Sequence, residues 1–359
     1  MSAPLRVAIS ASATSQRRRA FRLNVQETIV KDGVTALFGP SGAGKTTLLR
    51  CIAGLQRTDG RITFGEQHWQ DSDQRLFVAP HRRRIGFVFQ HPQLFGHLSV
   101  ARNLRFNQQL PDDSIETLVS SFGLADLLDA DPGSLSGGEQ QRVAAVRTLI
   151  SAPRLLLFDE PFSAVDAPRR RELLQHLRRH LKKHRVPAVY VTHDLAEAAG
   201  IADRMLQMTD GRVRGQGPIN RLLTDLEQPF CRAPDTVSVI DAGVARFDAA
   251  TRLCHVVIEG HTIAVPGLAP PVDHEQRLLI GARDISLSRQ RSPASSIVNA
   301  LDVEVTDILQ SDDIPFVVLQ LQVGALRLIC HVTYQSFQLM RIAIGERLAA
   351  HVKAVALQH

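Results

Sequence analysis

The feature that most constrains this chain is the segment GPSGAGKT at residues 39–46. A short apolar run, residues 34–38, comes directly before it. The pattern predicts a buried strand, a tight glycine loop and a helix over residues 46–53. Backbone N–H groups in such a loop, at the positive end of a helix, bind phosphate groups. The segment therefore predicts an α/β fold that holds a polyphosphate.

The residue types inside this loop predict individual roles. Lys45 is placed to reach the outer phosphates, and the hydroxyl of Thr46 to bind Mg²⁺. A glycine turn with only a structural role would not need Lys-Thr directly after Gly44. We expect ATP and Mg²⁺ to be the ligands, and the candidate nucleotide-binding residues here are Gly39, Pro40, Ser41, Gly42, Ala43, Gly44, Lys45, Thr46 and Thr47.

A second glycine-led segment, LSGGEQQ, occupies residues 135–141. Ser136, Gly137 and Gly138 open a predicted helix, and the apolar spacing of its later residues indicates one buried face. The helix start is another anion-accepting N-terminus. One nucleotide cannot use two such ends that lie far apart in one domain. The second segment therefore predicts that the chain works as half of a pair.

Two carboxylates follow an apolar strand at residues 155–158. Asp159 is expected to hold Mg²⁺ through water, as the second-motif aspartate of P-loop enzymes does. Glu160 is expected to polarise the attacking water and is the best candidate for a general base. An Asp-Glu pair after a strand is usually an exposed corner, and its order relative to the glycine loop favours the catalytic interpretation.

The composition excludes several classes of protein. The chain has 359 residues, a net charge of +6 and no apolar run long enough to span a bilayer. No secretion signal is evident at its start, and four cysteines without metal-ligand spacing suit reduced thiols in the cytosol. Arginine triplets at residues 17–19, 82–84 and 169–171 would suit either a nucleic-acid or membrane face, or solvated turns and helix starts. The aromatic content of 5% favours the second interpretation, so no nucleic-acid partner is expected.

The pattern of apolar and polar residues divides the chain into three parts. Residues 1–230 alternate apolar runs with amphipathic stretches, which is typical of an α/β domain with a parallel sheet. Residues 231–290 are expected to be a linker that contains a hairpin at 252–265. Residues 291–359 carry short alternating strands, such as 301–308, which suggest a small β-barrel. Further strands of the first domain are expected at 85–89, 154–158 and 188–192.

Residues 30–217 resemble the ATPase subunits of ABC transporters, because the segment at 135–141, followed by Arg142, matches that family nearly letter for letter. The resemblance implies an α/β P-loop NTPase domain followed by a small all-β barrel of the TOBE or MOP type. It also implies a homodimer in which Ser136, Gly137 and Gly138 of one subunit close over the ATP of the other.

The same resemblance implies roles for three further residues. Gln90 resembles the glutamine that contacts Mg²⁺ and water and senses the membrane subunit. Asp166, in the segment 163–166, resembles the loop that crosses the dimer, and His193 resembles the histidine that contacts the γ-phosphate and pairs with Glu160. The catalytic candidates are therefore Glu160, His193, Gln90 and Lys45. The aromatic residue that often stacks on adenine is not evident, and Phe21 is a weak candidate.

The last part of the chain resembles the molybdate-binding barrel of importer ATPases at residues 295–299, 333–336 and 350–355. A tetrahedral oxyanion is bound by hydroxyl and N–H donors and a fixed cation. The candidate donors are Ser296, Thr333, Ser336 and Lys353. Val298 stands where that pattern usually has arginine, which leaves open whether this barrel binds an anion or is structural.

The resemblance implies that ATP hydrolysis by this chain powers import of molybdate through separate permease subunits. The chain would lie on the cytoplasmic face of the bacterial inner membrane, with residues 82–95 docking on the permease and a substrate-binding protein as an indirect partner. An importer for sulfate, a polyamine or a sugar is the main alternative. A soluble ABC protein acting on nucleic acid usually has two ATPase halves, whereas only one glycine loop occurs here. A non-catalytic oxyanion sensor is disfavoured by Glu160 and His193.

Overall fold

The structure is a computed structural model that describes residues 4–13, 21–29, 33–267, 275–291 and 296–353. Contacts divide the chain into two units, Met1–Gln216 and Gly217–His359. The boundary expected near residue 230 therefore lies inside the second unit. Each unit is described by itself below.

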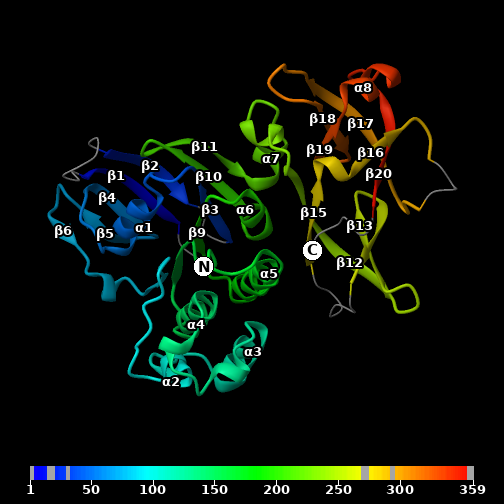
Figure 1. The fold of residues 1–359 in the computed structure, drawn as a ribbon. Helices are drawn as coiled ribbons and strands as arrows, with labels where there is room; N and C mark the ends of the chain where they lie inside the picture. The colour runs from blue at the N-terminus through cyan, green and yellow to red at the C-terminus, as the bar shows by residue number, and fades with distance from the viewer. Residues whose placement is uncertain (1–3, 14–20, 30–32, 268–274, 292–295, 354–359) are drawn as a thin grey trace. The chain divides into compact units, whose positions relative to one another are not determined.

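The first unit is built on a six-stranded sheet with the order β11-β10-β3-β9-β8-β7 (Figure 1). The five strands from β10 to β7 run parallel. Strands β3, β8 and β9 are buried almost throughout, which explains why they appear in the sequence as unbroken apolar runs. The strands are β3 Val34–Phe38, β7 Ile85–Val88, β8 Leu155–Asp159, β9 Ala188–Thr192, β10 Arg204–Thr209 and β11 Arg212–Pro218.

The register of this sheet brings four strand ends to one edge. Phe38 at the end of β3 pairs with Thr192 at the end of β9, and Asp159 at the end of β8 pairs with Val191. Val88, the last residue of β7, pairs with Phe158. The glycine loop and the segments that carry the other catalytic candidates follow these four strands. Parallel strands thus gather the site at their carboxyl ends.

A second, antiparallel sheet in this unit has the order β2-β1-β4-β5-β6. Its strand β1 buries alternate side chains, from Leu5 to Ala11, as a half-buried strand does. Helix α1, Lys45–Ala53, contributes Leu48, Leu49 and Ile52 to a core shared by both sheets. The strands are β1 Leu5–Ala13, β2 Phe21–Ile29, β4 Asp59–Phe64, β5 Gln67–Asp71 and β6 Leu76–Phe77.

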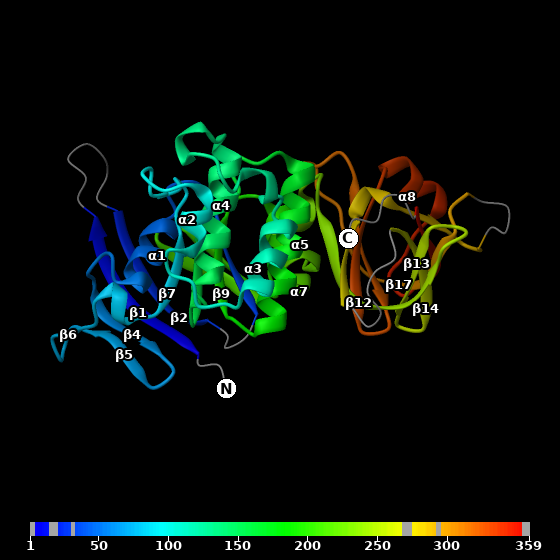
Figure 2. The same ribbon diagram turned by 90° about the horizontal axis from the view of Figure 1, so that it is seen from below.

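Helices complete the first unit. Figure 1 shows α2 and α3 near α4, and both helices contact it, while Figure 2 shows α3 between α4 and α5 in that view. The helices are α2 Val100–Arg105, α3 Asp112–Ser121, α4 Gly137–Ile150, α5 Ala167–His184 and α6 Leu195–Ile201, with short 3₁₀ turns at η1 Pro80–Arg82, η2 Ala125–Leu127 and η3 Pro132–Ser134. Among the residues that the structure describes, no helix combines the length and apolar character needed to cross a bilayer.

The second unit joins two antiparallel sheets, of order β14-β13-β12-β15 and β16-β20-β17-β18-β19, around one core. Asn299 links them, because its side-chain amide donates to the carbonyl of Ala264 at 2.9 Å and accepts from its N–H at 2.7 Å. The elements are α7 Ile219–Thr224, η4 Pro229–Arg232, β12 Val237–Asp248, β13 Leu253–Ile258, β14 His261–Pro266, β15 Glu275–Gly281, η5 Ala282–Asp284, β16 Ile285–Ser288, β17 Asn299–Leu309, β18 Val317–Val323, β19 Leu326–Val332, α8 Tyr334–Met340 and β20 Arg347–Val352.

One expectation about the arginine triplets was wrong. Arg83 is 2% exposed, not solvated, and its guanidinium donates to the carbonyls of Cys51 and Ile52 at the end of α1 and to those of Trp69 and Val78. Burial lowers the pKa of Arg83 to about 10. The triplet at 169–171 lies at the start of α5, as expected, and residues 17–19 lie outside the described residues.

Candidate nucleotide-binding and hydrolysis site

The glycine loop has a backbone that only glycine adopts readily. Gly39 has a φ of +155°, and a Cβ there would lie 2.1 Å from the carbonyl oxygen of Met208. Gly42 and Gly44 have φ values of +83° and +97°, in the left-handed region. Helix α1 begins directly after Gly44, at Lys45. The loop therefore points toward a helix N-terminus, the geometry that suits a phosphate.

Lys45 is held by its own loop. Its Nζ donates to the carbonyl oxygens of Gly39 at 2.7 Å and Pro40 at 2.9 Å, and the residue is 6% exposed. Burial lowers the pKa of this ammonium, and the nearby carboxylates of Glu160 and Asp159 partly oppose the shift. The glycine loop and the carboxyl end of β8 thus both lie close to the ammonium group of Lys45.

Thr46 and Asp159 form an oxygen-rich pair beside the loop. The Thr46 hydroxyl donates to Oδ1 of Asp159 at 2.9 Å, and Asp159 is 4% exposed. Burial raises the pKa of Asp159, and the hydrogen bond from Thr46 partly opposes the rise. A hydroxyl and a carboxylate are hard oxygen donors of the kind that Mg²⁺ takes, so the donor set fits this ion.

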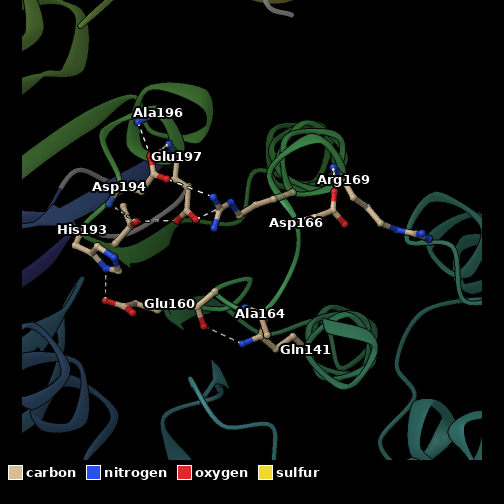
Figure 3. Close-up of polar contacts among 12 residues, drawn as sticks. Gln141, Glu160, Ala164, Asp166, Arg169, His193, Asp194, Ala196 and Glu197 are labelled. Atoms are coloured by element: carbon tan, nitrogen blue, oxygen red, sulfur yellow. Dashed lines mark hydrogen bonds and ion pairs between the residues drawn. The ribbon is translucent and has the colours of Figure 1, made fainter. Parts of the chain in front are cut away.

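Glu160 directly follows β8, and its carboxylate faces His193, which directly follows β9 (Figure 3). Its N–H donates to the carbonyl of Val191 at 3.2 Å, and its φ of +47° turns the chain sharply after β8. Its carboxylate contacts Nδ1 of His193 at 2.9 Å through Oε1 and accepts from Nε2 of Gln90 at 3.3 Å through Oε2. The structure thus brings together three residues that are 33 and 70 positions apart.

The glycine-led segment at 135–141, called the signature segment below, opens α4 with a capping box. The Ser136 N–H donates to the Glu139 carboxylate at 2.8 Å, and the Glu139 N–H donates to the Ser136 hydroxyl at 3.4 Å. A Cβ on Gly138 would lie 3.0 Å from the carbonyl oxygen of Ala164, so a larger residue there would require that turn to shift by a few tenths of an ångström. Within the described residues, no hydrogen bond joins Ser136, Gly137 or Gly138 to the loop at 39–46.

Gln141 is a residue to which the sequence assigned no role. Its Nε2 donates to Ser163 Oγ at 3.1 Å and to the Gln90 carbonyl at 3.3 Å, while its Oε1 accepts from the Ala164 N–H at 2.9 Å (Figure 3). A polar residue on the buried face of a helix was the signal available. Gln141 therefore links the signature helix to the segment of Gln90 and to the turn that leads into Asp166.

Two other nucleotide-site candidates have defined places. Asp166 is the N-cap of α5, and its carboxylate accepts from the Arg169 N–H at 3.1 Å. Thr47 lies in the first turn of α1. Phe21, the adenine candidate, is the first residue of β2, but its side chain lies outside what the structure describes.

The predicted oxyanion residues belong to the second unit. Thr333 caps α8, accepting from the Ser336 N–H at 3.1 Å and donating to the Ser336 hydroxyl at 2.9 Å. Ser296 and Lys353 are exposed, and Val298 is 64% exposed. In the described part of the chain, no hydrogen bond joins Ser296 or Lys353 to Thr333 or Ser336.

Comparison with known proteins adds the family. Residues 23–163 match the model of the ABC transporter family, and residues 295–358 match that of the TOBE domain. The molybdenum import ATP-binding protein ModC of Aromatoleum aromaticum is 41% identical over 343 residues, which cover 94% of this chain and 91% of the relative. The chain belongs to the ABC transporter ATP-binding proteins. ModC of Methylococcus capsulatus is 40% identical to this ABC protein, with 94% of this chain and 96% of the relative covered.

Solved structures support the same assignment of the ABC fold. A dimeric ATP-binding cassette, MJ0796, in a post-hydrolysis state with ADP and Pi is 26% identical, with a TM-score of 0.51, and covers 60% of this chain and 98% of its own. CbiO1 from Clostridium perfringens is 27% identical, with a TM-score of 0.52 over 63% of this chain and 92% of its own. The predicted fold class, a P-loop ABC ATPase unit followed by a TOBE domain, is confirmed.

Proposed function

We propose that this chain is the ATP-hydrolysing subunit of an ABC importer for molybdate. One observation carries the assignment of the cargo: relatives named as molybdenum import ATP-binding proteins match 94% of the chain, through both units. A likeness confined to the ATPase unit would not distinguish between cargoes, because ABC transporters of many kinds share that unit.

The geometry of the site supports hydrolysis. The loop at 39–46 and Lys45 bind the phosphates. Glu160, held by His193 and Gln90, orients and polarises the attacking water, and His193 is exposed enough to reach the γ-phosphate. Thr46 and Asp159, with Gln90, hold Mg²⁺, which when bound neutralises charge on the phosphates.

A homodimer completes the site in this proposal. Ser136, Gly137 and Gly138 lie at an exposed or half-buried helix start whose N–H groups attract an anion. In this proposal the nucleotide that they bind lies on the glycine loop of a second copy. Asp166, at the start of α5, then crosses toward the other site. Dimeric cassettes are among the similar solved structures.

The remaining partners follow from the importer role. The chain docks through residues 82–95 on permease subunits at the cytoplasmic face of the inner membrane, and a substrate-binding protein acts on the permease from the other side. The rings of Phe95 and Phe106 pack against each other in a tilted arrangement, with centroids 4.4 Å apart, and Phe106 is 63% exposed, which supplies an apolar contact beside this segment. Nucleic acid is not a partner in this account.

The cargo is tested in the assembled transporter. Chain and permease, reconstituted with the substrate-binding protein, are assayed for ATP hydrolysis and uptake with molybdate, tungstate and sulfate. We expect molybdate to raise both rates and sulfate to leave them at the basal level. Stimulation by sulfate with molybdate inert would overturn the cargo, while hydrolysis itself would stand.

Oxyanion binding by the second unit is a separate part of the proposal. Thr333 and Ser336 present two neighbouring hydroxyls and a helix start, and Ser296 and Lys353 complete the predicted set. Calorimetric titration of the full chain with molybdate, against T333A/S336A as the matched variant, tests it. Equal heats from the two proteins would show that this unit is structural.

A further inference from the structure

A buried carboxylate, that of Glu197, comes four residues after His193 in the chain. Glu197, the third residue of α6, is 7% exposed. Its Oε2 accepts from the Thr192 hydroxyl at 2.7 Å and from the Tyr190 hydroxyl at 3.2 Å. Both hydroxyls belong to β9, the strand that ends next to His193. Glu197 therefore fastens the end of that strand.

Asp194, which follows His193 in the chain, is also held by hydrogen bonds. The Asp194 N–H donates to the Thr192 hydroxyl oxygen at 3.0 Å, and Asp194 Oδ1 accepts from the N–H groups of Ala196 and Glu197 at 2.8 and 3.1 Å (Figure 3). The backbone on both sides of His193 is thus fixed, while its side chain is 59% exposed and reaches Glu160. The orientation of the His193 ring is therefore set by the hydrogen-bonded backbone on either side of it and not by side chains packed around the ring.

Arg170 supplies the positive charge for this cluster. Its Nε lies 3.2 Å from Glu197 Oε1, and its Nη2 lies 3.4 Å from Asp194 Oδ2. Burial raises the pKa of Glu197, while the Thr192 hydrogen bond and the Arg170 charge oppose the rise. Loss of the arginine would leave a buried carboxylate without its charge partner, a strongly unfavourable arrangement.

Arg170 comes from the segment that carries Asp166. It lies in the first turns of α5, and its N–H donates to the Asp166 carbonyl at 2.9 Å. The Asp166 carboxylate caps the same helix start (Figure 3). The Arg170 side chain thus connects the Asp166 turn directly with Asp194, which follows His193, and through Glu197 with Thr192, which precedes it.

We propose that Arg170 is a positioning residue for hydrolysis, which ties the Asp166 turn to the backbone on either side of His193. This proposal rests on the proposed roles of Glu160 and His193. A shift of about 1 Å in a group that contacts the reacting atoms can cost about 10²-fold in rate, so a remote anchor can be worth that much. The arrangement also lets a movement of the Asp166 turn in the dimer reach His193.

The test compares R170M with R178M in the full chain. Arg178 lies further along the same helix and pairs with Asp203 at 3.1 Å, so its loss also removes an ion pair from α5. The Asp203 carboxylate accepts from the Val34 N–H at the start of β3, the opposite end of that strand from the site. Each variant is measured for kcat and KM of ATP hydrolysis, thermal midpoint, and hydrogen exchange at the Asp194 amide.

We expect R170M to lower kcat at least about 10-fold with KM changed less than about 3-fold. Exchange at the Asp194 amide should rise, since its acceptor Thr192 is released when Glu197 loses its partner. R178M should lower the thermal midpoint but leave kcat and that exchange rate near the wild type. Should R170M fail to fold, R170K keeps the charge without the fork of donors and is expected to show the same pattern, weaker.

Two outcomes would overturn the proposal. One is wild-type kcat and wild-type exchange at Asp194 in both R170M and R170K. The other is an equal loss of kcat in R178M, which would mean a general effect of stability. A failure of the proposed hydrolysis itself is distinguishable, because the wild-type chain would then lack ATPase activity while the exchange comparison still tests the anchor.

Discussion

Replacing Glu160 by glutamine removes the candidate base and changes little else. The side chain is 18% exposed and its two oxygens contact His193 at 2.9 Å and Gln90 at 3.3 Å. Glutamine has nearly the same shape and keeps one oxygen to accept from Gln90. Folding and ATP binding should therefore survive, while the capacity to take a proton from water is lost.

Loss of a positioned general base typically costs about 10²–10⁴ in rate. That range corresponds to about 2.7–5.4 kcal/mol of activation free energy. The assay is phosphate release from ATP under single-turnover conditions, together with the Kd for ATP from a fluorescent analogue. E172Q, which neutralises an exposed carboxylate on α5, is the matched control and should hydrolyse ATP at the wild-type rate. Hydrolysis by E160Q within about 3-fold of the wild type would refute the role of Glu160.

Three further predictions concern the backbone at Gly39, the side-chain amide of Asn299 and the thiol of Cys51. G39A forces a Cβ to within 2.1 Å of a backbone carbonyl at a strained φ, and it should cost about 1–3 kcal/mol in urea unfolding and abolish ATP binding. N299L leaves the N–H and carbonyl of Ala264 unpaired, and the free energy of unfolding should fall by about 1–3 kcal/mol for each group. Burial raises the pKa of the Cys51 thiol to about 11, so the folded chain holds this proton more tightly than the unfolded chain. Its stabilising effect is present below the unfolded thiol pKa and lost as pH rises through about 11, and iodoacetamide near pH 8 should label it only after unfolding.

The backbone of the site could be predicted from the sequence because its signals are local. The glycine loop, the apolar runs of β3, β8 and β9, and the polar residues after them are each readable within about ten residues. Buried parallel strands are apolar on both faces, and their carboxyl ends meet at one edge of a sheet. That reasoning places Glu160 near the glycine loop, whereas the roles of Gln90 and His193 follow from the resemblance to ABC transporter ATPases.

The side-chain network behind the site could not be predicted in the same way. Arg170 and Glu197 are 27 positions apart and sit in no motif, so no spacing indicates that they pair. Arg83 is hidden among three arginines, and which of them turns inward depends on the carbonyls at the end of α1. The strand at the start of the chain is a different case. Leu5 to Ala11 alternates between buried apolar and more exposed residues, which is the pattern of a half-buried strand and is readable from the sequence.

The central claim is that two copies of this chain trap ATP between the glycine loop of one and the signature helix of the other. The most direct measurement is the mass of E160Q by light scattering, with and without ATP and Mg²⁺. The account predicts about 39.6 kDa without nucleotide and about twice that mass with it, and S136R, which places a bulky side chain at the tip of the signature helix, should stay monomeric. The account would be contradicted if the mass of E160Q stayed at 39.6 kDa in saturating ATP and if the chain did not pair even in the presence of its permease.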